Sequence, residues 1–274
     1  MLAQKQLLWC VLAYASQIAS GLALPMPESS QPNYGLPQRN ALTPRAKKGF
    51  GNGVPLRIMP LGASITFGFG SSDNNGYRKD LRDKLEAAGN KVNMVGNNPS
   101  GTMKDNDTEG WKSYTIDQVR DKANTSVPKY KPNVVLVNVG TNDCVQNKDV
   151  PNAGARLRTL LDALYAESPK ATVILSTLLV NRDPDVQARV EDYNAQLKKV
   201  GDSLQRDGKK RLVVVDMQSD NGPEVDDLNT DGTHPDDAGY RKMADVFYEG
   251  LEEADRRDYF VAADKVDGLA DDGA

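Results

Sequence analysis

Histidine and cysteine are the scarcest reactive side chains in this 274-residue chain. There is one histidine, His234, and there are two cysteines, Cys10 and Cys144. Cys10 lies in an N-terminal segment that we expect to be removed, so Cys144 has no partner for an intrachain disulfide. The fold must then be stabilised by burial of apolar surface, which a chain of this length can supply. Any chemistry that needs an imidazole must use His234.

The sequence also lacks a basic excess and a long apolar run. Its 34 Lys and Arg residues stand against 38 Asp and Glu residues, which gives a net charge of −4. Nucleic-acid binding needs a basic face, so we expect no nucleic-acid partner. A membrane anchor needs about 20 uninterrupted apolar residues. The most apolar stretch is broken by Gln17, Ser20 and Pro25, and the C-terminus has no hydrophobic tail, so we expect no membrane partner either.

The first residues, MLAQKQLLWCVLAYASQIASGLALP, have the pattern of a secretory signal. Lys5 supplies a positive start, Leu7 to Ala15 form a short apolar segment, and SGLA provides small residues for cleavage near Ala23. We therefore expect a signal peptide over 1–23 and a secreted, extracellular protein. Two N-glycosylation sequons, at Asn106 and Asn124, are compatible with secretion and with a glycoprotein.

The rest of the chain divides into a polar segment, one domain and a tail. Residues 24–52 are rich in Pro, Ser, Gly, Gln and Asn, which indicates a linker or propeptide. The domain is expected over 53–257, and 258–274 is expected to be an acidic, frayed C-terminal tail.

Short apolar runs alternate with helical periods inside this domain. We predict strands over 56–61, 91–96, 133–140, 171–177 and 211–217. We predict amphipathic helices over 77–89, 153–167, 185–205 and 236–254. Strands that are apolar throughout and alternate with helices favour a parallel sheet covered on both faces. The fold class is therefore α/β: a three-layer α/β/α sandwich with a five-stranded parallel sheet.

Polar residues follow three of the predicted strands, at the sheet edge where function collects in such folds. Ser64 follows the first strand; it is a nucleophile only if a base takes its proton, and otherwise caps a helix. Asn142 follows the third; its amide can donate to an oxyanion or simply form a turn. Asp231 and His234 follow the fifth, where the carboxylate can orient the imidazole, although a solitary histidine is more often a surface or packing residue.

GASI, GTND and DGTH, in this order and at these strand ends, resemble blocks one, three and five of the SGNH or GDSL hydrolases. The resemblance runs from about Pro55 to Phe247 and implies the flavodoxin-like fold of the SGNH hydrolases. The chain most resembles the fungal carbohydrate esterases of family 3, the acetylxylan esterase type. This resemblance is carried by the segments PLGASITFGFGSSDNNGYRKDLRD and NMVGNNPSGTMKDNDTEGWKSYTIDQV. It implies a nucleophile, a general base and an orienting acid, namely Ser64, His234 and Asp231. It also implies an oxyanion hole from the Ser64 N–H, the Ser113 N–H and the Asn142 side chain, and no metal or cofactor.

Two positions depart from the family pattern. Ala63 stands where the family often has Asp, which we expect to be tolerated because Asp231 is the acid of the triad. EGWKSYT places Ser113 where EG-x-x-G-[WY] has a glycine, a residue used for positive φ or close approach. We assign Gly110 and Trp111 beside it to substrate binding, with loop packing as the alternative for Trp111. Cys144 is expected to be a small buried hydrophobe.

Other motifs fail on their spacing. DNDTEG, residues 105–110, begins like a calcium loop, but Ile116 stands at its twelfth position, so an EF-hand is excluded. GASIT lacks the closing glycine of a nucleophile elbow, which argues against the α/β-hydrolase fold.

The sequence therefore predicts a secreted, monomeric serine esterase. The expected substrates are short-chain esters, acetyl esters in particular, on an acylated carbohydrate, with plant cell-wall polysaccharide such as xylan as the expected polymer. One alternative is a catalytically weak carbohydrate-binding or surface-interaction protein on the same scaffold, suggested by Ser113. Another is a lipid or lysophospholipid esterase, which ranks lower because no apolar lid or membrane-facing helix is evident.

Overall fold

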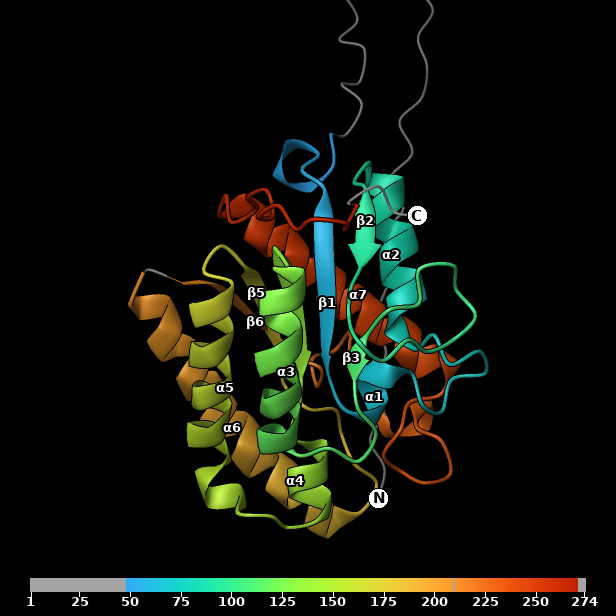
Figure 1. Ribbon diagram of the computed structural model, residues 1–274. Coiled ribbons are helices and arrows are strands. Elements are labelled where there is room, and N and C mark those ends of the chain that lie inside the picture. The colour runs from blue at the N-terminus through green and yellow to red at the C-terminus, as the bar shows by residue number, and fades with distance from the viewer. Residues whose placement is uncertain (1–47, 209, 271–274) are drawn as a thin grey trace, which may run out of the picture. The chain divides into compact units, whose positions relative to one another are not determined.

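A parallel β-sheet forms the centre of the domain in the computed structural model, which describes residues 48–208 and 210–270 (Figure 1). The predicted signal peptide and most of the predicted linker lie outside the described residues. The strands are β1 (Leu56–Gly62), β2 (Val92–Met94), β3 (Glu109–Gly110), β4 (Val134–Asn138), β5 (Thr172–Ser176) and β6 (Arg211–Val215). Five of them run in the order β2-β1-β4-β5-β6, all parallel, and β3 pairs with the end of β1.

The predicted α/β sandwich is confirmed, with one strand added. All five expected strands are present, but β3 is only two residues long and gives no apolar run in the sequence. It pairs Leu61 and Gly62 of β1 with Glu109 and Gly110. The chain that follows β3 therefore starts beside the carboxyl end of β1.

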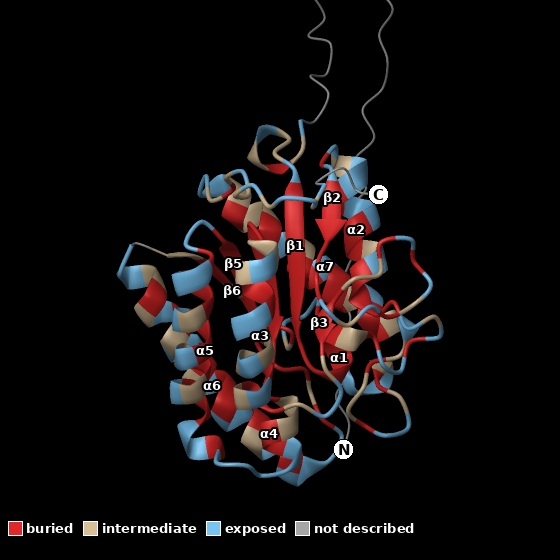
Figure 2. Ribbon diagram, in the orientation of Figure 1, coloured by how far each residue is buried: buried red, intermediate tan, exposed pale blue. Residues whose placement is uncertain are grey.

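Helices cover both faces of the sheet (Figures 1 and 2). α3 (Ile116–Tyr130), α5 (Ala153–Glu167) and α6 (Pro184–Arg206) pack on one face, and α2 (Tyr77–Ala88) and α7 (Asp237–Arg256) on the other. Alternate residues of β1 enter the two cores: Met59 and Leu61 face α3, whereas Leu56 and Ile58 face α2 and α7. Burial on both sides explains why the strands are apolar throughout.

Short helices occupy the carboxyl-end loops. α1 (Ser64–Phe67) follows β1, and α4 (Thr141–Val145) follows β4. Both lie at the lower edge of the sheet in Figure 1. The remaining short elements are η1 (Phe50–Asn52), η2 (Val150–Asn152) and η3 (Val225–Asp227).

The expected linker boundary at residue 52 needs correction. Phe50 is buried, and its ring centroid lies 5.8 Å from that of Phe260 and 5.3 Å from that of Tyr248. The packed domain therefore includes residues just before 53 and just after 257.

The expectation of a frayed tail is also wrong for the described residues 258–270. The side chain of Asn133 donates to the carbonyl of Val261 at 2.8 Å, and the Arg57 guanidinium donates to the carbonyl of Asp264 at 2.9 Å. These two contacts use the tail's backbone carbonyls, and the ring of Phe260 adds a side-chain contact, so the acidic composition of the tail gave no sign of its docking.

Across residues 48–208 and 210–270, no helix combines the length and apolar character that a membrane crossing requires.

Candidate active site

Ser64 lies in the turn from β1 into α1, where the backbone is tightly packed. A Cβ on Gly62 would lie 2.1 Å from the carbonyl oxygen of Asn138 and 2.3 Å from the hydroxyl of Thr66, so only glycine fits. Ser64 is the first residue of α1, and the residue at the N-cap is Ala63, which makes no side-chain capping bond. Ser64 is therefore not a helix cap, and its hydroxyl is free to face another element.

The structure brings Ser64, His234 and Asp231 together in one hydrogen-bonded chain. Ser64 Oγ lies 2.8 Å from His234 Nε2, and His234 Nδ1 lies 2.7 Å from Asp231 Oδ2. The other carboxylate oxygen of Asp231 accepts the backbone N–H groups of Thr233 at 2.9 Å and His234 at 3.0 Å. A hydroxyl, an imidazole and a carboxylate thus meet from opposite ends of the domain sequence.

Asn229 connects the loop that carries Asp231 and His234 to the loop that follows α1 and Ser64. Its side-chain amide donates to the carbonyl of Gly70, at 3.1 Å, and to the carbonyl of Pro235, at 2.8 Å. Nearby, the hydroxyl of Tyr240 in α7 donates to the carbonyl of Phe69 at 2.6 Å. These bonds fix the two loops relative to each other, so that His234 is held against Ser64.

The surroundings of Asp231 favour its ionised form. Partial burial opposes ionisation, but hydrogen bonds from the backbone N–H groups of His234 and Thr233 and from the imidazole hold the pKa of Asp231 below its usual range. An ionised carboxylate at Nδ1 requires the proton of the neutral ring on that nitrogen. Nε2 is then the acceptor that faces the hydroxyl of Ser64.

The loops that follow β3 and β4 begin beside Ser64. Gly62 pairs with Gly110 of β3 on one side and with Asn138 of β4 on the other. The side-chain amide of Asn142 donates to the carbonyl of Tyr114 at 2.9 Å. An Asn amide has two N–H donors, so one remains for a ligand.

Ser113 has the backbone conformation that favours glycine. Its φ is +66°, and the N–H of Tyr114 closes the turn on the carbonyl of Trp111 at 3.2 Å. The glycine in the family pattern is thus explained by a left-handed turn, which Ser113 also adopts. Because the backbone keeps this turn, a serine does not displace the N–H group.

Gly110 has a packing role in the structure, and its assignment to substrate binding stays a prediction. It is buried, its N–H donates to the hydroxyl of Thr108 at 3.0 Å, and its carbonyl accepts from Asn98 at 2.6 Å. A Cβ here would lie 2.4 Å from the backbone nitrogen of Phe67. The structure uses Gly110 to let α1 approach β3.

Trp111 is held by its neighbours. Its indole N–H donates to the buried Glu109 at 2.8 Å, and the amino group of Lys122 lies 4.0 Å from the ring centroid. These contacts match the packing alternative, and contact with a substrate stays a prediction.

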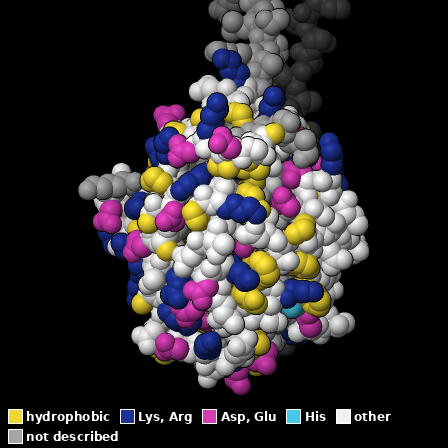
Figure 3. Space-filling view, viewed as in Figure 1, with side chains coloured by type: hydrophobic (Ala, Val, Ile, Leu, Met, Phe, Trp, Pro, Cys, Tyr) yellow, Lys and Arg dark blue, Asp and Glu magenta, His cyan; other side chains and the backbone are white. Residues whose placement is uncertain are grey.

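Two residues beside the site carried no recognisable signal in the sequence. The ring of Phe69 is 42% exposed and meets the imidazole of His234 edge-on, at 4.7 Å between centroids. The amino group of Lys112 lies 4.8 Å from the ring centroid of Phe67 and 5.8 Å from that of Phe69. The only histidine, drawn cyan in Figure 3, reaches the surface beside hydrophobic, basic and acidic side chains. The one sequence signal for Phe69 is that it lies five residues after Ser64.

Cys144 is a buried hydrophobe, as expected. Burial raises the pKa of its thiol to about 12, and its sulfur contacts the carbonyl of Arg189 at 3.6 Å. Since the thiolate is the reactive form, Cys144 is not a nucleophile at neutral pH.

Comparisons with known proteins find esterases among the proteins that this chain resembles. A multidomain esterase of Ruminococcus flavefaciens is 29% identical over 72% of this chain, and the chain spans only 28% of that protein. The structure of a family 3 carbohydrate esterase from Clostridium thermocellum is similar with a TM-score of 0.66 and 26% identity. That match covers 74% of this chain and 98% of the other.

A family 3 carbohydrate esterase from Talaromyces cellulolyticus shares the fold, with a TM-score of 0.63 and 21% identity over 74% of this chain and 99% of that one. The profile of the GDSL-like Lipase/Acylhydrolase family matches residues 61–242. This range spans the serine, asparagine and histidine loops. The chain therefore belongs to the GDSL-like lipase/acylhydrolase family.

Proposed function

We propose that this esterase is a secreted serine hydrolase that removes acetyl groups from acetylated carbohydrate such as plant cell-wall xylan. The observation that carries the mechanism is the chain of 2.8 Å and 2.7 Å contacts from Ser64 through His234 to Asp231. The carbohydrate substrate is supported by the family 3 carbohydrate esterases that this chain resembles.

The first half-reaction forms an acyl-enzyme. His234 Nε2 takes the proton of Ser64 as Oγ attacks the ester carbonyl, and Asp231 stabilises the imidazolium that results. When the tetrahedral intermediate collapses, the C–O bond to the sugar breaks and the imidazolium returns its proton to the leaving oxygen. Acetate is then esterified to Ser64 and the deacetylated sugar leaves.

The second half-reaction uses water in place of the serine hydroxyl. His234 takes a proton from water, the hydroxide attacks the acetyl carbonyl, and Ser64 leaves with the proton that His234 returns. Acetate is released and the enzyme is restored without a metal or cofactor.

Three donors would stabilise the negative oxygen in both steps. The N–H of Ser64 stands at the start of α1, where the helix offers no intrahelical partner. The N–H of Ser113 and the second N–H of Asn142 come from the loops that flank it. Donors fixed before the reaction stabilise charge that develops only in the transition state.

The geometry of Ser113 favours an enzyme over a catalytically weak binding protein. The binding alternative was motivated by the loss of a glycine, but the turn that glycine would form is present, with φ at +66°. The exposed face of Phe69 beside His234 suits a sugar ring, because an aromatic side chain offers flat apolar contact area.

Hydrolysis of a chromogenic acetate and of acetylated xylan tests this proposal. Ser64→Ala should abolish both activities, whereas Ser219→Ala, on an exposed loop serine, should retain them. A serine-reactive phosphonate should add its mass to the peptide that contains Ser64. Full activity of Ser64→Ala would refute the mechanism, and activity on the chromogenic acetate alone would refute the polysaccharide substrate.

Secretion is tested separately, by expressing the full chain in a secreting host. The mature protein should be in the medium, with an N-terminus at or after Leu24. An intact N-terminus in the cell pellet would contradict this part of the proposal.

A further inference from the structure

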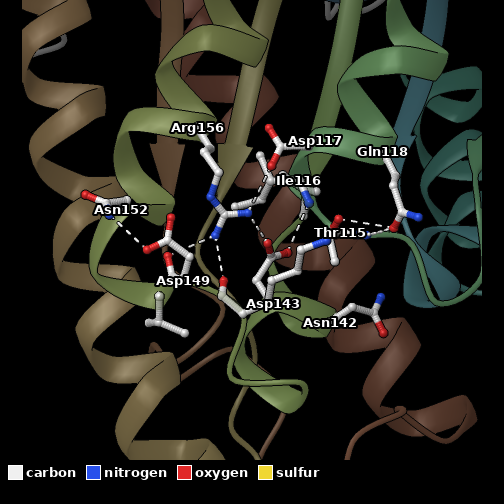
Figure 4. A network of polar contacts seen from close by, with 12 residues as sticks. Thr115, Ile116, Asp117, Gln118, Asn142, Asp143, Asp149, Asn152 and Arg156 are labelled. Carbon is white, nitrogen blue, oxygen red and sulfur yellow. Dashed lines mark hydrogen bonds and ion pairs between the residues drawn. The ribbon is translucent and has the colours of Figure 1, made fainter.

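A buried carboxylate follows directly after Asn142 in the sequence. The side chain of Asp143 is 0% exposed, and one of its oxygens accepts the backbone N–H of Ile116 at 3.0 Å. Its other oxygen is paired with the guanidinium of Arg156, from α5 (Figure 4). The proposed mechanism gives Asp143 and Arg156 no part in proton transfer.

The guanidinium of Arg156 connects several segments around this carboxylate. Besides Asp143, it contacts the carboxylate of Asp117 at 3.3 Å and donates to the carbonyls of Lys148 at 2.8 Å and Asp149 at 3.1 Å. The start of α3, the turn of α4 and the loop after α4 are thus joined to one cation on α5.

These contacts surround the two loop donors of the proposed oxyanion hole. Ile116 begins α3 only three residues after Ser113, and Asp143 is the neighbour of Asn142. Asn142 itself donates to the carbonyl of Tyr114, between the two. In Figure 4 the Asn142 amide points away from the guanidinium while Asp143 points toward it. A shift of Asp143 would therefore move both donors.

The turn at Ser113 makes such support necessary. A residue with a Cβ is disfavoured at positive φ, so the surrounding structure must hold it there. One constraint on this turn comes from the start of α3, where the N–H of Thr115 donates to the side chain of Gln118 at 2.9 Å. The bond from Ile116 to Asp143 provides the second. Burial raises the pKa of Asp143, the hydrogen bond from Arg156 opposes that rise, and the pairing with Arg156 fixes the position of the carboxyl group.

We propose that Arg156 and Asp143 form a positioning pair that sets the oxyanion donors Ser113 and Asn142 for catalysis. This inference rests on the proposed serine mechanism. Neither residue touches the reacting atoms. Their effect is transmitted through the backbone of Ile116 to Ser113 and through the Asp143 backbone to Asn142.

The pair should therefore affect the chemical step and leave substrate binding nearly unchanged. Removal of one oxyanion donor lowers kcat by about 10²–10³-fold in other hydrolases, so a displaced donor in Arg156→Met should lower kcat by about 10–100-fold. KM should change little, because the interaction that is lost belongs to the transition state.

A double-mutant cycle with Asn142→Ala distinguishes positioning from a general loss of structure. If Arg156 acts through the oxyanion donors, Arg156→Met should lower kcat far less in the Asn142→Ala background than in the wild type. Equal fold-losses in the two backgrounds, or an unchanged kcat in Arg156→Met, would overturn the inference.

Arg158→Met is the matched control, because it removes the same side chain from the same helix. Arg158 pairs with Asp162 at 2.9 Å on the surface, and its side chain is 38% exposed, against 14% for Arg156. Its kcat should equal that of the wild type. A kcat loss in Arg158→Met as large as in Arg156→Met would contradict a specific role for Arg156.

Arg156→Lys keeps the test decisive if Arg156→Met does not fold. A lysine can pair with Asp143 but cannot also reach both carbonyls, so it should retain more kcat than Arg156→Met, with the same dependence on Asn142. A kcat loss independent of Asn142 would again overturn the inference.

Phosphonate labelling separates this inference from the proposed function. If Ser64 is not labelled in the wild type, the serine mechanism itself fails. If Ser64 is labelled and Arg156→Met keeps the wild-type kcat, only the positioning pair fails.

Discussion

Replacing Ser113 by glycine tests whether the backbone, rather than the side chain, is what this position supplies. Ser113 has φ at +66° and is exposed, so its hydroxyl is not needed for packing. A left-handed conformation costs a residue with a Cβ about 1–2 kcal/mol. A glycine removes that cost but frees the unfolded chain, which offsets the gain by about 0.4–1 kcal/mol.

The net effect of Ser113→Gly should be a stabilisation of about 0.5–1 kcal/mol. For a domain of this size, that corresponds to a rise in Tm of about 1–4 °C. Ser113→Val, which puts a β-branched side chain at the same φ, should lower both Tm and kcat. Ser113→Gly should keep kcat within about twofold of the wild type, because the oxyanion N–H remains.

Ser219→Gly is the matched control, since Ser219 is also exposed in a loop but has no positive φ. It should be destabilised by about 0.4–1 kcal/mol through the unfolded chain alone. The assays are thermal unfolding and steady-state hydrolysis of a chromogenic acetate. A Ser113→Gly variant that unfolds at a lower temperature than the wild type, as Ser219→Gly should, would refute the strain argument. A large loss of kcat in Ser113→Gly would show that the serine hydroxyl takes part in catalysis.

Three further predictions follow from the site. The carboxyl group of Asp231 should titrate below the usual range of an aspartate, because the effect of burial on its pKa is outweighed by hydrogen bonds from His234 and Thr233; an NMR titration that finds an ordinary or raised pKa for Asp231 would be contrary to the account. Phe69→Ala should lower kcat/KM about 3–30-fold, because it removes both the edge-on contact with His234, worth about 0.5–1.5 kcal/mol, and an apolar face for the substrate. Val145→Ala, at another exposed apolar residue, should leave kcat/KM unchanged. Iodoacetamide should leave the native enzyme active, because burial raises the pKa of the Cys144 thiol to about 12. Rapid inactivation of the wild type that does not occur in Cys144→Ala would disprove this.

The sequence predicted the parts of the fold that depend on local pattern. Apolar runs located five strands because both faces of the sheet are buried, as β1 shows with Met59 on one side and Ile58 on the other. It missed β3, whose two residues are specified by pairing with β1 rather than by their own composition. It also missed the docking of residues 258–270, which depends on backbone carbonyls and on the buried ring of Phe260 rather than on a periodic apolar pattern.

The candidate site shows the same division. Ser64, Asp231 and His234 could be predicted because each needs a particular side chain at a strand end. The expected glycine at position 113 was correctly associated with positive φ, but only coordinates show that Ser113 adopts it. Arg156 could not be found, because its partners are two backbone carbonyls and two carboxylates brought together by the packing of α5 against α3.

Turnover of His234→Ala on a chromogenic acetate tests the central claim most directly. His234 is the only histidine, so no other imidazole can replace it as the base for Ser64. The account predicts a loss of kcat of about 10⁴-fold or more, with unchanged thermal unfolding. A folded His234→Ala enzyme whose kcat stays within about tenfold of the wild type would contradict it.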